Sequence, residues 1–125
     1  MTRELVAVAD GVGGWNRKGV DPGIFARELC GHVWAGYRQQ VADKQTISLK
    51  QLLIDSVAKT KATGTSTFAM ALMDEDNALL KTLNLGDSGF MIVRPTADPV
   101  LHQQQTEISD NTFEIIFRSN GSVLY

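Results

Sequence analysis

The chain has 125 residues, near the usual size of one domain, of which 43% are hydrophobic and 21% are charged. This balance predicts a globular protein and excludes wholesale disorder. The formal net charge of −2, with no basic cluster, argues against nucleic acid and against anionic membrane as partners. No apolar run reaches membrane-spanning length, and because Cys30 is the only cysteine an internal disulfide is excluded.

The first predicted element is a strand. Residues 5–9 are short, apolar and stopped by Asp-Gly, which favours a buried strand. Residues 16–20 then read as a loop. Neither a secretory signal nor a transit peptide precedes the strand, so we expect an intracellular location, mitochondrial or cytoplasmic. Whether an upstream targeting segment has been lost is left open by the sequence.

Two helices are predicted next. Asp21 suits an N-cap and Pro22 the first helical position, so a helix is expected to run to about residue 43. Its apolar side chains recur every fourth residue, at Phe25, Leu29, Val33, Tyr37 and Val41. Ser48 and Gln51 form a capping-box pair, which predicts a second helix ending near residue 61.

The rest of the chain is predicted to be mainly strands and turns. The expected strands are residues 66–73, 78–84, 90–94 and 113–117. A polar four-residue turn joins the first two as a hairpin, and a glycine-flanked turn at residues 85–89 precedes the third. These elements predict the α+β class, with two helices covering one antiparallel sheet.

Two aspartates stand at the ends of predicted strands beside glycine. Asp10 precedes Gly11, and Asp87 lies between Gly86 and Ser88. Carboxylate and carbonyl oxygens at such turns suit a hard divalent cation such as Mg²⁺ or Mn²⁺. If the turns meet at one end of the sheet, they can share a metal cluster of the kind that hydrolyses phosphate esters. The alternative is a pair of structural turns with solvated aspartates.

Three motifs in order give a more specific indication. They are residues 8–15 (VADGVGGW), 64–67 (GTST) and 84–90 (NLGDSGF). Together they resemble the PPM family, the metal-dependent type 2C protein phosphatases, and most closely its mitochondrial-type branch. The resemblance covers residues 5–105, the N-terminal half of such a catalytic domain. It implies part of an α-β-β-α sandwich, and it leaves residues 106–125 as a divergent tail.

The resemblance also implies a site and a reaction. Asp10 matches the aspartate that bridges two catalytic Mg²⁺ or Mn²⁺ ions, and Gly11 matches the glycine whose carbonyl binds one of them. Asp87 matches an aspartate of a third, weaker metal position. The implied activity is hydrolysis of phosphoserine or phosphothreonine in phosphoprotein substrates by metal-activated water, without a covalent intermediate.

Some residues of the family pattern have no match in this sequence. The family has a phosphate-binding arginine and an acidic metal-shell residue upstream of the first turn, and two later aspartates, none of which is matched here. Arg3 does not match that arginine and reads as solvent-facing, and residues 110–111 come too early for the last motif. We therefore expect weak or no activity from the 125-residue chain. The alternative is a non-catalytic truncated or pseudo-phosphatase that acts as a binding or scaffold module. Exposed sheet edges predict self-association.

The remaining candidates have structural interpretations. His32 is expected to be solvated, and Cys30 is expected to lie on the apolar side of the first helix as a core residue. Trp15 either lines the site or packs the turn, with equal weight. Residues 74–76 are predicted to form an acidic hairpin tip, because a calcium loop needs more ligands at regular spacing.

Overall fold

The computed structural model describes residues 3–95 and 113–120, which fall into two compact units that divide after Ser88. The first contains β1 (Arg3–Val8), the 3₁₀ helix η1 (Gly13–Lys18), α1 (Pro22–Ala42), α2 (Leu49–Lys59), β2 (Phe68–Asp74) and β3 (Leu79–Leu85). The second contains β4 (Met91–Pro95) and β5 (Phe113–Arg118). The predicted α+β class is confirmed, whereas the predicted domain boundary at residue 105 lies outside the described residues.

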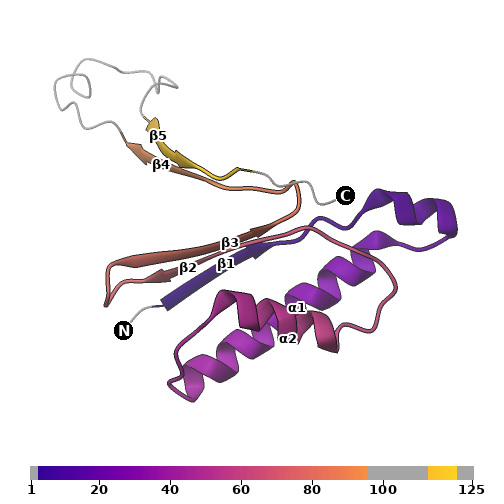
Figure 1. The fold of residues 1–125 in the computed structure, drawn as a ribbon, viewed down its shortest axis with the longest axis horizontal. Helices are drawn as coiled ribbons and strands as arrows, with labels where there is room; N and C mark the ends of the chain where they lie inside the picture. Colours follow the sequence, from indigo (N-terminus) through magenta and orange to yellow (C-terminus); the bar gives the residue numbers. More distant parts are fainter. Residues whose placement is uncertain (1–2, 96–112, 121–125) are drawn as a thin grey trace, which may run out of the picture. The chain divides into compact units, whose positions relative to one another are not determined.

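The first unit is built on a three-stranded antiparallel sheet in the order β1-β2-β3 (Figure 1). Leu72 in β2 lies opposite Leu5 on one side and opposite Lys81 on the other, which sets the register. As the central strand, β2 is the most buried of the three. Both hairpin strands were predicted to within two residues, because their turn residues and apolar runs are local signals.

The start of each helix follows its predicted cap. The Asp21 carboxylate accepts a hydrogen bond from the Gly23 N–H at 2.8 Å, with Pro22 as the first residue of α1. The Ser48 hydroxyl accepts one from the Gln51 N–H at 3.3 Å at the start of α2. These side chains satisfy N–H groups that have no partner inside the helix.

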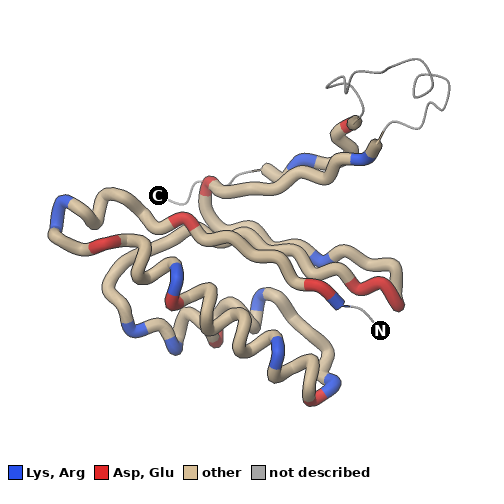
Figure 2. The backbone as a smooth tube through the Cα atoms, turned by 180° about the vertical axis from the view of Figure 1, so that it is seen from behind, with Lys and Arg blue, Asp and Glu red and all other residues tan. Residues whose placement is uncertain are grey.

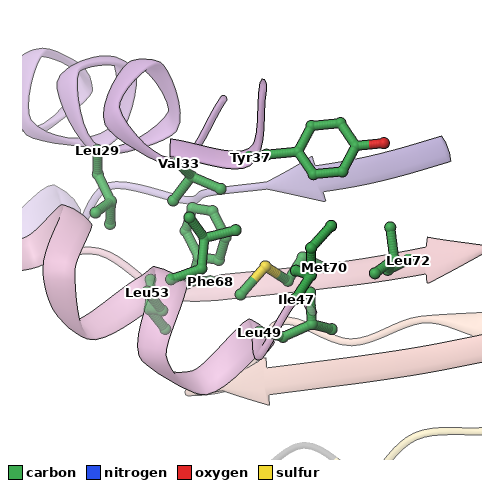
Figure 3. Close-up of a cluster of buried hydrophobic side chains, with 10 residues drawn as sticks. Leu29, Val33, Tyr37, Ile47, Leu49, Leu53, Phe68, Met70 and Leu72 are labelled. Carbon is green, nitrogen blue, oxygen red and sulfur yellow. The ribbon is translucent and has the colours of Figure 1, made fainter. Parts of the chain in front are cut away.

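Both helices pack on the same face of the sheet, and their apolar side chains form one core with β2 (Figure 3). Phe68 is 0% exposed and lies in the middle of this core. The helices come close at Gly36, where an added Cβ would lie 2.8 Å from Leu52 Cδ1. The core consists of Leu29, Val33, Tyr37, Ile47, Leu49, Leu52, Leu53, Phe68, Met70 and Leu72. Two helices covering one sheet is the predicted arrangement.

The predicted strand over residues 5–9 is present as β1, but the prediction that it is buried is wrong. β1 covers residues 3–8, pairs with β2 only, and leaves Val6 69% and Val8 54% exposed. These valines face away from the helices, while Leu5 faces the core. A continuous apolar run does not by itself reveal whether both faces of a strand are covered.

Two further local predictions need correction. Arg3 is not solvent-facing, because its side chain is 21% exposed and its Nε lies 3.6 Å from Oδ2 of the buried Asp74. Asp74 is the buried member of the predicted acidic hairpin tip, where it also accepts hydrogen bonds from Asn77. Residues 16–20 are not simply a loop, because η1 extends to Lys18 and ends at Gly19 with φ +72°.

The second unit is a hairpin of β4 and β5, close to the two strands predicted for this part of the chain. The rings of Phe90 and Phe117 stack with their centroids 5.5 Å apart. The Arg94 guanidinium lies 2.6 Å from the Glu114 carboxylate across the strands, and both side chains are largely exposed. Exposed cross-strand ion pairs contribute little stability.

Charged residues of both signs are interspersed along the described chain (Figure 2). The described part of the chain contains no helix apolar enough over a sufficient length to cross a membrane.

Candidate metal centre

Asp10 and Asp87 lie at the same end of the first sheet. β1 and β3 both run antiparallel to β2, so β1 and β3 end at the edge where β2 begins (Figure 1). Asp10 comes two residues after β1 and Asp87 two residues after β3. Both residues are exposed. This antiparallel topology brings the two motif turns to one edge, as the shared-cluster hypothesis requires.

The chain after β1 continues to pair with the chain before β2. Gly11 lies opposite Ser66 in an isolated antiparallel bridge. On either side of it, the Thr67 N–H donates to the Asp10 carbonyl at 3.0 Å and the Val12 N–H donates to the Thr65 carbonyl at 3.0 Å. In this pattern the Gly11 carbonyl points away from Ser66. No hydrogen bond to that oxygen is present among the described residues.

Gly11 is required here by a close approach of two backbone segments. A Cβ at this position would lie 2.3 Å from the carbonyl oxygen of Pro22, in the first turn of α1. Real Cβ atoms do not come this close to backbone, so a larger residue would push the turn away from the helix. Its φ is not in the left-handed region, unlike that of Gly86, where φ is +90°.

The predicted ligands are hard oxygen donors. The carboxylates of Asp10 and Asp87 take part in none of the ion pairs among residues 3–95 and 113–120. With the Gly11 carbonyl they match the preference of Mg²⁺ and Mn²⁺ for oxygen. Within those same residues, no cluster of three or more acidic, histidine or cysteine side chains is placed to hold a metal. The donor set therefore fits a divalent cation in kind but supplies only part of a coordination shell.

Trp15 packs the first turn. Its indole N–H donates to the Thr65 hydroxyl at 2.9 Å, and the Lys18 ammonium lies 5.0 Å from its ring centroid. The tryptophan thereby joins η1 to the segment that leads into β2. Of the two interpretations that the sequence left open, these contacts support the packing role.

The two other candidates from the sequence lie away from these turns. Cys30 is half-buried and lines an apolar groove of about 370 Å³ between α1 and β1. Burial raises the pKa of its thiol, which fits its predicted structural role. His32 is also half-buried, with Nε2 3.6 Å from the Glu28 carboxylate, so the prediction of a solvated histidine is wrong.

Glu28 is a residue that the sequence analysis missed. Its carboxylate accepts hydrogen bonds from the backbone N–H groups of Lys61 at 2.7 Å and Ala62 at 3.0 Å. These bonds hold the loop after α2 against α1, just before the segment that pairs with Asp10. The hydrogen bond from Lys61 is the largest cause that holds the pKa of the Glu28 carboxyl below its usual value, and Ala62 and His32 add to it. A lone glutamate in a helix gives no sequence signal for such a contact.

This contact predicts a pH dependence of stability. Because the folded-state pKa of Glu28 is lowered, its contribution to stability is complete above the unfolded pKa and is lost as pH falls through the folded pKa. Between about pH 5 and about pH 3, the free energy of unfolding should fall more steeply for the wild-type chain than for Glu28→Gln. Urea unfolding at each pH measures this. Glu4→Gln, at an exposed position on β1, is the control, and a wild-type slope equal to that of Glu28→Gln would contradict the prediction.

Comparison with solved structures supports the fold. The X-ray structure of the photosystem II phosphatase PBCP superimposes with a TM-score of 0.69, covering 98% of this chain and 44% of that one, at 23% identity. The arrangement described above is therefore part of the type 2C phosphatase fold, and the predicted partial PPM fold is confirmed.

Sequence comparison gives the family relationship. The chain is 38% identical over 111 residues to the protein phosphatase PTC7 homolog fig of Drosophila virilis, covering 84% of this chain and 34% of that protein. It is 38% identical over 112 residues to the Drosophila melanogaster protein of the same name, covering 86% and 34%. No family model matches the chain. The predicted resemblance to PPM protein phosphatases is confirmed, and the chain spans about a third of the length of these curated relatives.

Proposed function

We propose that this chain forms the part of a metal-dependent protein serine/threonine phosphatase that presents Asp10, the Gly11 carbonyl and Asp87 to Mg²⁺ or Mn²⁺. The observation that supports this is the location of both aspartate turns at one end of one antiparallel sheet. Relatives that are named protein phosphatases and share 38% of aligned residues support the same reaction class. The substrates are then phosphoproteins.

Each residue of the site has a separate role in this proposal. Asp10 provides negative charge at a position held by pairing with the segment just before β2, and Gly11 adds a carbonyl oxygen beside it. Asp87 provides a second carboxylate from the end of β3. Bound Mg²⁺ or Mn²⁺ supplies activation of water as a nucleophile and neutralises charge on the phosphoryl oxygens.

A non-catalytic binding module is the second candidate function. The observation that favours it is that the described residues contain no group of three or more acidic, histidine or cysteine side chains that could hold a metal ion. Two carboxylates and one carbonyl bind a divalent cation weakly, because water must complete the shell. We therefore expect the 125-residue chain to turn over a phosphopeptide slowly or not at all, even with Mn²⁺.

Metal binding tests the site directly. We expect Mn²⁺ to broaden the amide NMR signals of residues 11 and 88, with a dissociation constant that rises at least about tenfold in Asp10→Asn and less in Asp87→Asn, since each change removes a ligand charge. Asp76→Asn is the matched control, because this exposed aspartate is in the hairpin at the opposite end of the sheet. A phosphopeptide assay with Mn²⁺ is run on the same samples.

The outcomes separate the two candidates. Mn²⁺ binding that Asp10→Asn weakens and Asp76→Asn does not would support the metal centre, even when turnover is at background. Binding that is absent, or equal in wild type and Asp10→Asn, would contradict the metal centre and favour the binding module. Rapid Mn²⁺-dependent turnover that disappears in Asp10→Asn would support the phosphatase and refute the expected weakness.

A further inference from the structure

We propose that Thr67 is a positioning residue whose side-chain hydroxyl ties the Asp10 turn to the Asp87 turn. This inference rests on the proposed metal centre. Thr67 is partly buried and stands just before β2, between the ends of β1 and β3. Hydrogen bonds connect Thr67 to both turns.

The hydrogen bonds run from one turn to the other. The Asp10 N–H donates to Thr67 Oγ1 at 3.2 Å, and the Thr67 N–H donates back to the Asp10 carbonyl at 3.0 Å. On its other side, Thr67 Oγ1 lies 2.6 Å from Ser88 Oγ, next to Asp87. Thr67 therefore fixes the backbone at the first aspartate and holds the neighbour of the second.

The chemistry of a hydroxyl suits this position. A hydroxyl offers one donor and two acceptor sites, so Thr67 can accept from the Asp10 N–H and still share a proton with Ser88. A backbone N–H at this place could not accept a hydrogen bond, and an apolar side chain could neither donate nor accept one. The 2.6 Å oxygen separation is within the normal range for an O–H···O hydrogen bond.

The methyl group of Thr67 serves the second turn. A Cβ at Gly86 would lie 3.0 Å from Thr67 Cγ2, so this glycine packs closely on the methyl group. Gly86 also has φ +90°, which favours glycine, and Asp87 follows directly. Because a β-branched side chain has few χ1 rotamers, the hydroxyl and the methyl group are held in place together.

A hydrogen-bonded connection of this kind matters because carboxylates bind metal well only when they are held in position. Residues that orient ligands through hydrogen bonds typically change metal affinity by about 10–100-fold when mutated. Both turns lie beyond the ends of β1 and β3, so the distance between them is set by backbone outside the regular strands. Thr67 connects both turns at this point, so it is expected to set the spacing of their oxygens.

Two substitutions separate the hydroxyl from the methyl group. Thr67→Val keeps the shape and removes the hydroxyl, while Thr67→Ser keeps the hydroxyl and removes the methyl group. In the full 125-residue chain, we expect Thr67→Val to raise the Mn²⁺ dissociation constant about tenfold, measured by the free-ion EPR signal. We expect the Asp10 amide to exchange with solvent at least about tenfold faster. Thr67→Ser should stay within about threefold of wild type in both measurements.

Each outcome decides between explanations. If Thr67→Val speeds exchange at Asp10 but binds Mn²⁺ as wild type does, the positioning role is overturned and the metal centre stands. If Thr67→Ser loses as much affinity as Thr67→Val, the methyl packing matters and the hydroxyl role is overturned. If the wild-type chain binds Mn²⁺ no better than Asp10→Asn, the proposed function fails and the positioning role fails with it.

A third variant protects the test against loss of folding. If far-UV circular dichroism shows that Thr67→Val is unfolded, Ser88→Ala is used instead. It removes only the hydrogen bond between the Thr67 and Ser88 hydroxyls and leaves the bond from the Asp10 N–H to Thr67 in place. We expect Ser88→Ala to raise the Mn²⁺ dissociation constant about threefold while exchange at the Asp10 amide stays slow. An unchanged Mn²⁺ dissociation constant in a folded Ser88→Ala variant would overturn the proposal that Thr67 positions the two turns.

Discussion

Phe68→Ala is expected to lower the free energy of unfolding of the first unit by about 3–5 kcal/mol. Phe68 is 0% exposed on the central strand and packs in the core that both helices share (Figure 3). Truncation to alanine removes the buried ring and leaves a cavity, because helices anchored by their own caps cannot collapse fully into it. The free energy of unfolding of a domain of this size is typically only about 5–15 kcal/mol, so the substitution would remove much of it.

Denaturant unfolding followed by circular dichroism measures this loss. Phe113→Ala is the matched control, since Phe113 is 61% exposed on β5 and should change stability by no more than about 0.5 kcal/mol. A loss below about 1 kcal/mol in Phe68→Ala would contradict the described core, because a fully buried ring cannot be removed at so small a cost.

Gly11→Ala is expected to destabilise the chain by about 1–3 kcal/mol and to weaken Mn²⁺ binding at least about tenfold. The added methyl group would lie 2.3 Å from the Pro22 carbonyl oxygen, and neither backbone segment can move alone. Gly11 is held to Ser66 by the hydrogen bonds beside their bridge, and Pro22 is held by the Asp21 cap. Relief of the clash must therefore shift the Gly11 carbonyl, which is one of the proposed ligands.

Gly13→Ala provides the comparison within the same motif. An added Cβ at Gly13 meets nothing within 4 Å, and its φ is not in the left-handed region, so stability should change by no more than about 0.5 kcal/mol. Thermal unfolding and the Mn²⁺ titration are measured on both variants. Equal behaviour of the two alanine variants would show that Gly11 is not held against α1.

The two predictions separate fold from site. Phe68→Ala reduces the stability of the whole first unit but lies outside the proposed ligands. Under conditions where this variant is still folded, we therefore expect it to bind Mn²⁺ with the affinity of the wild-type chain. Gly11→Ala acts next to the proposed ligands, so its effect on Mn²⁺ affinity should persist in the folded protein. Measured at one temperature well below both transitions, the pair distinguishes loss of fold from loss of ligand geometry.

Much of the secondary structure was predictable because its signals are local. The caps at Asp21 and Ser48 are recognised from neighbouring residues, and both helices begin where these caps predict. The hairpin of β2 and β3 follows from two apolar runs around a polar turn. The aspartate turns were also identified from sequence, because glycine next to a strand-end carboxylate is a short pattern. Their role as metal ligands remains a prediction.

What the sequence did not reveal depends on residues far apart in the chain. Thr67 bonds to the Asp10 amide across 57 positions, and Glu28 bonds to the Lys61 amide across 33. The need for glycine at position 11 comes from the start of α1 passing directly over it. The exposure of Val6 and Val8 arises because both helices cover the opposite face of the sheet. Local propensity indicates where strands and turns form, but only chain packing decides which faces are buried and which turns meet, since these contacts join segments with no common local pattern.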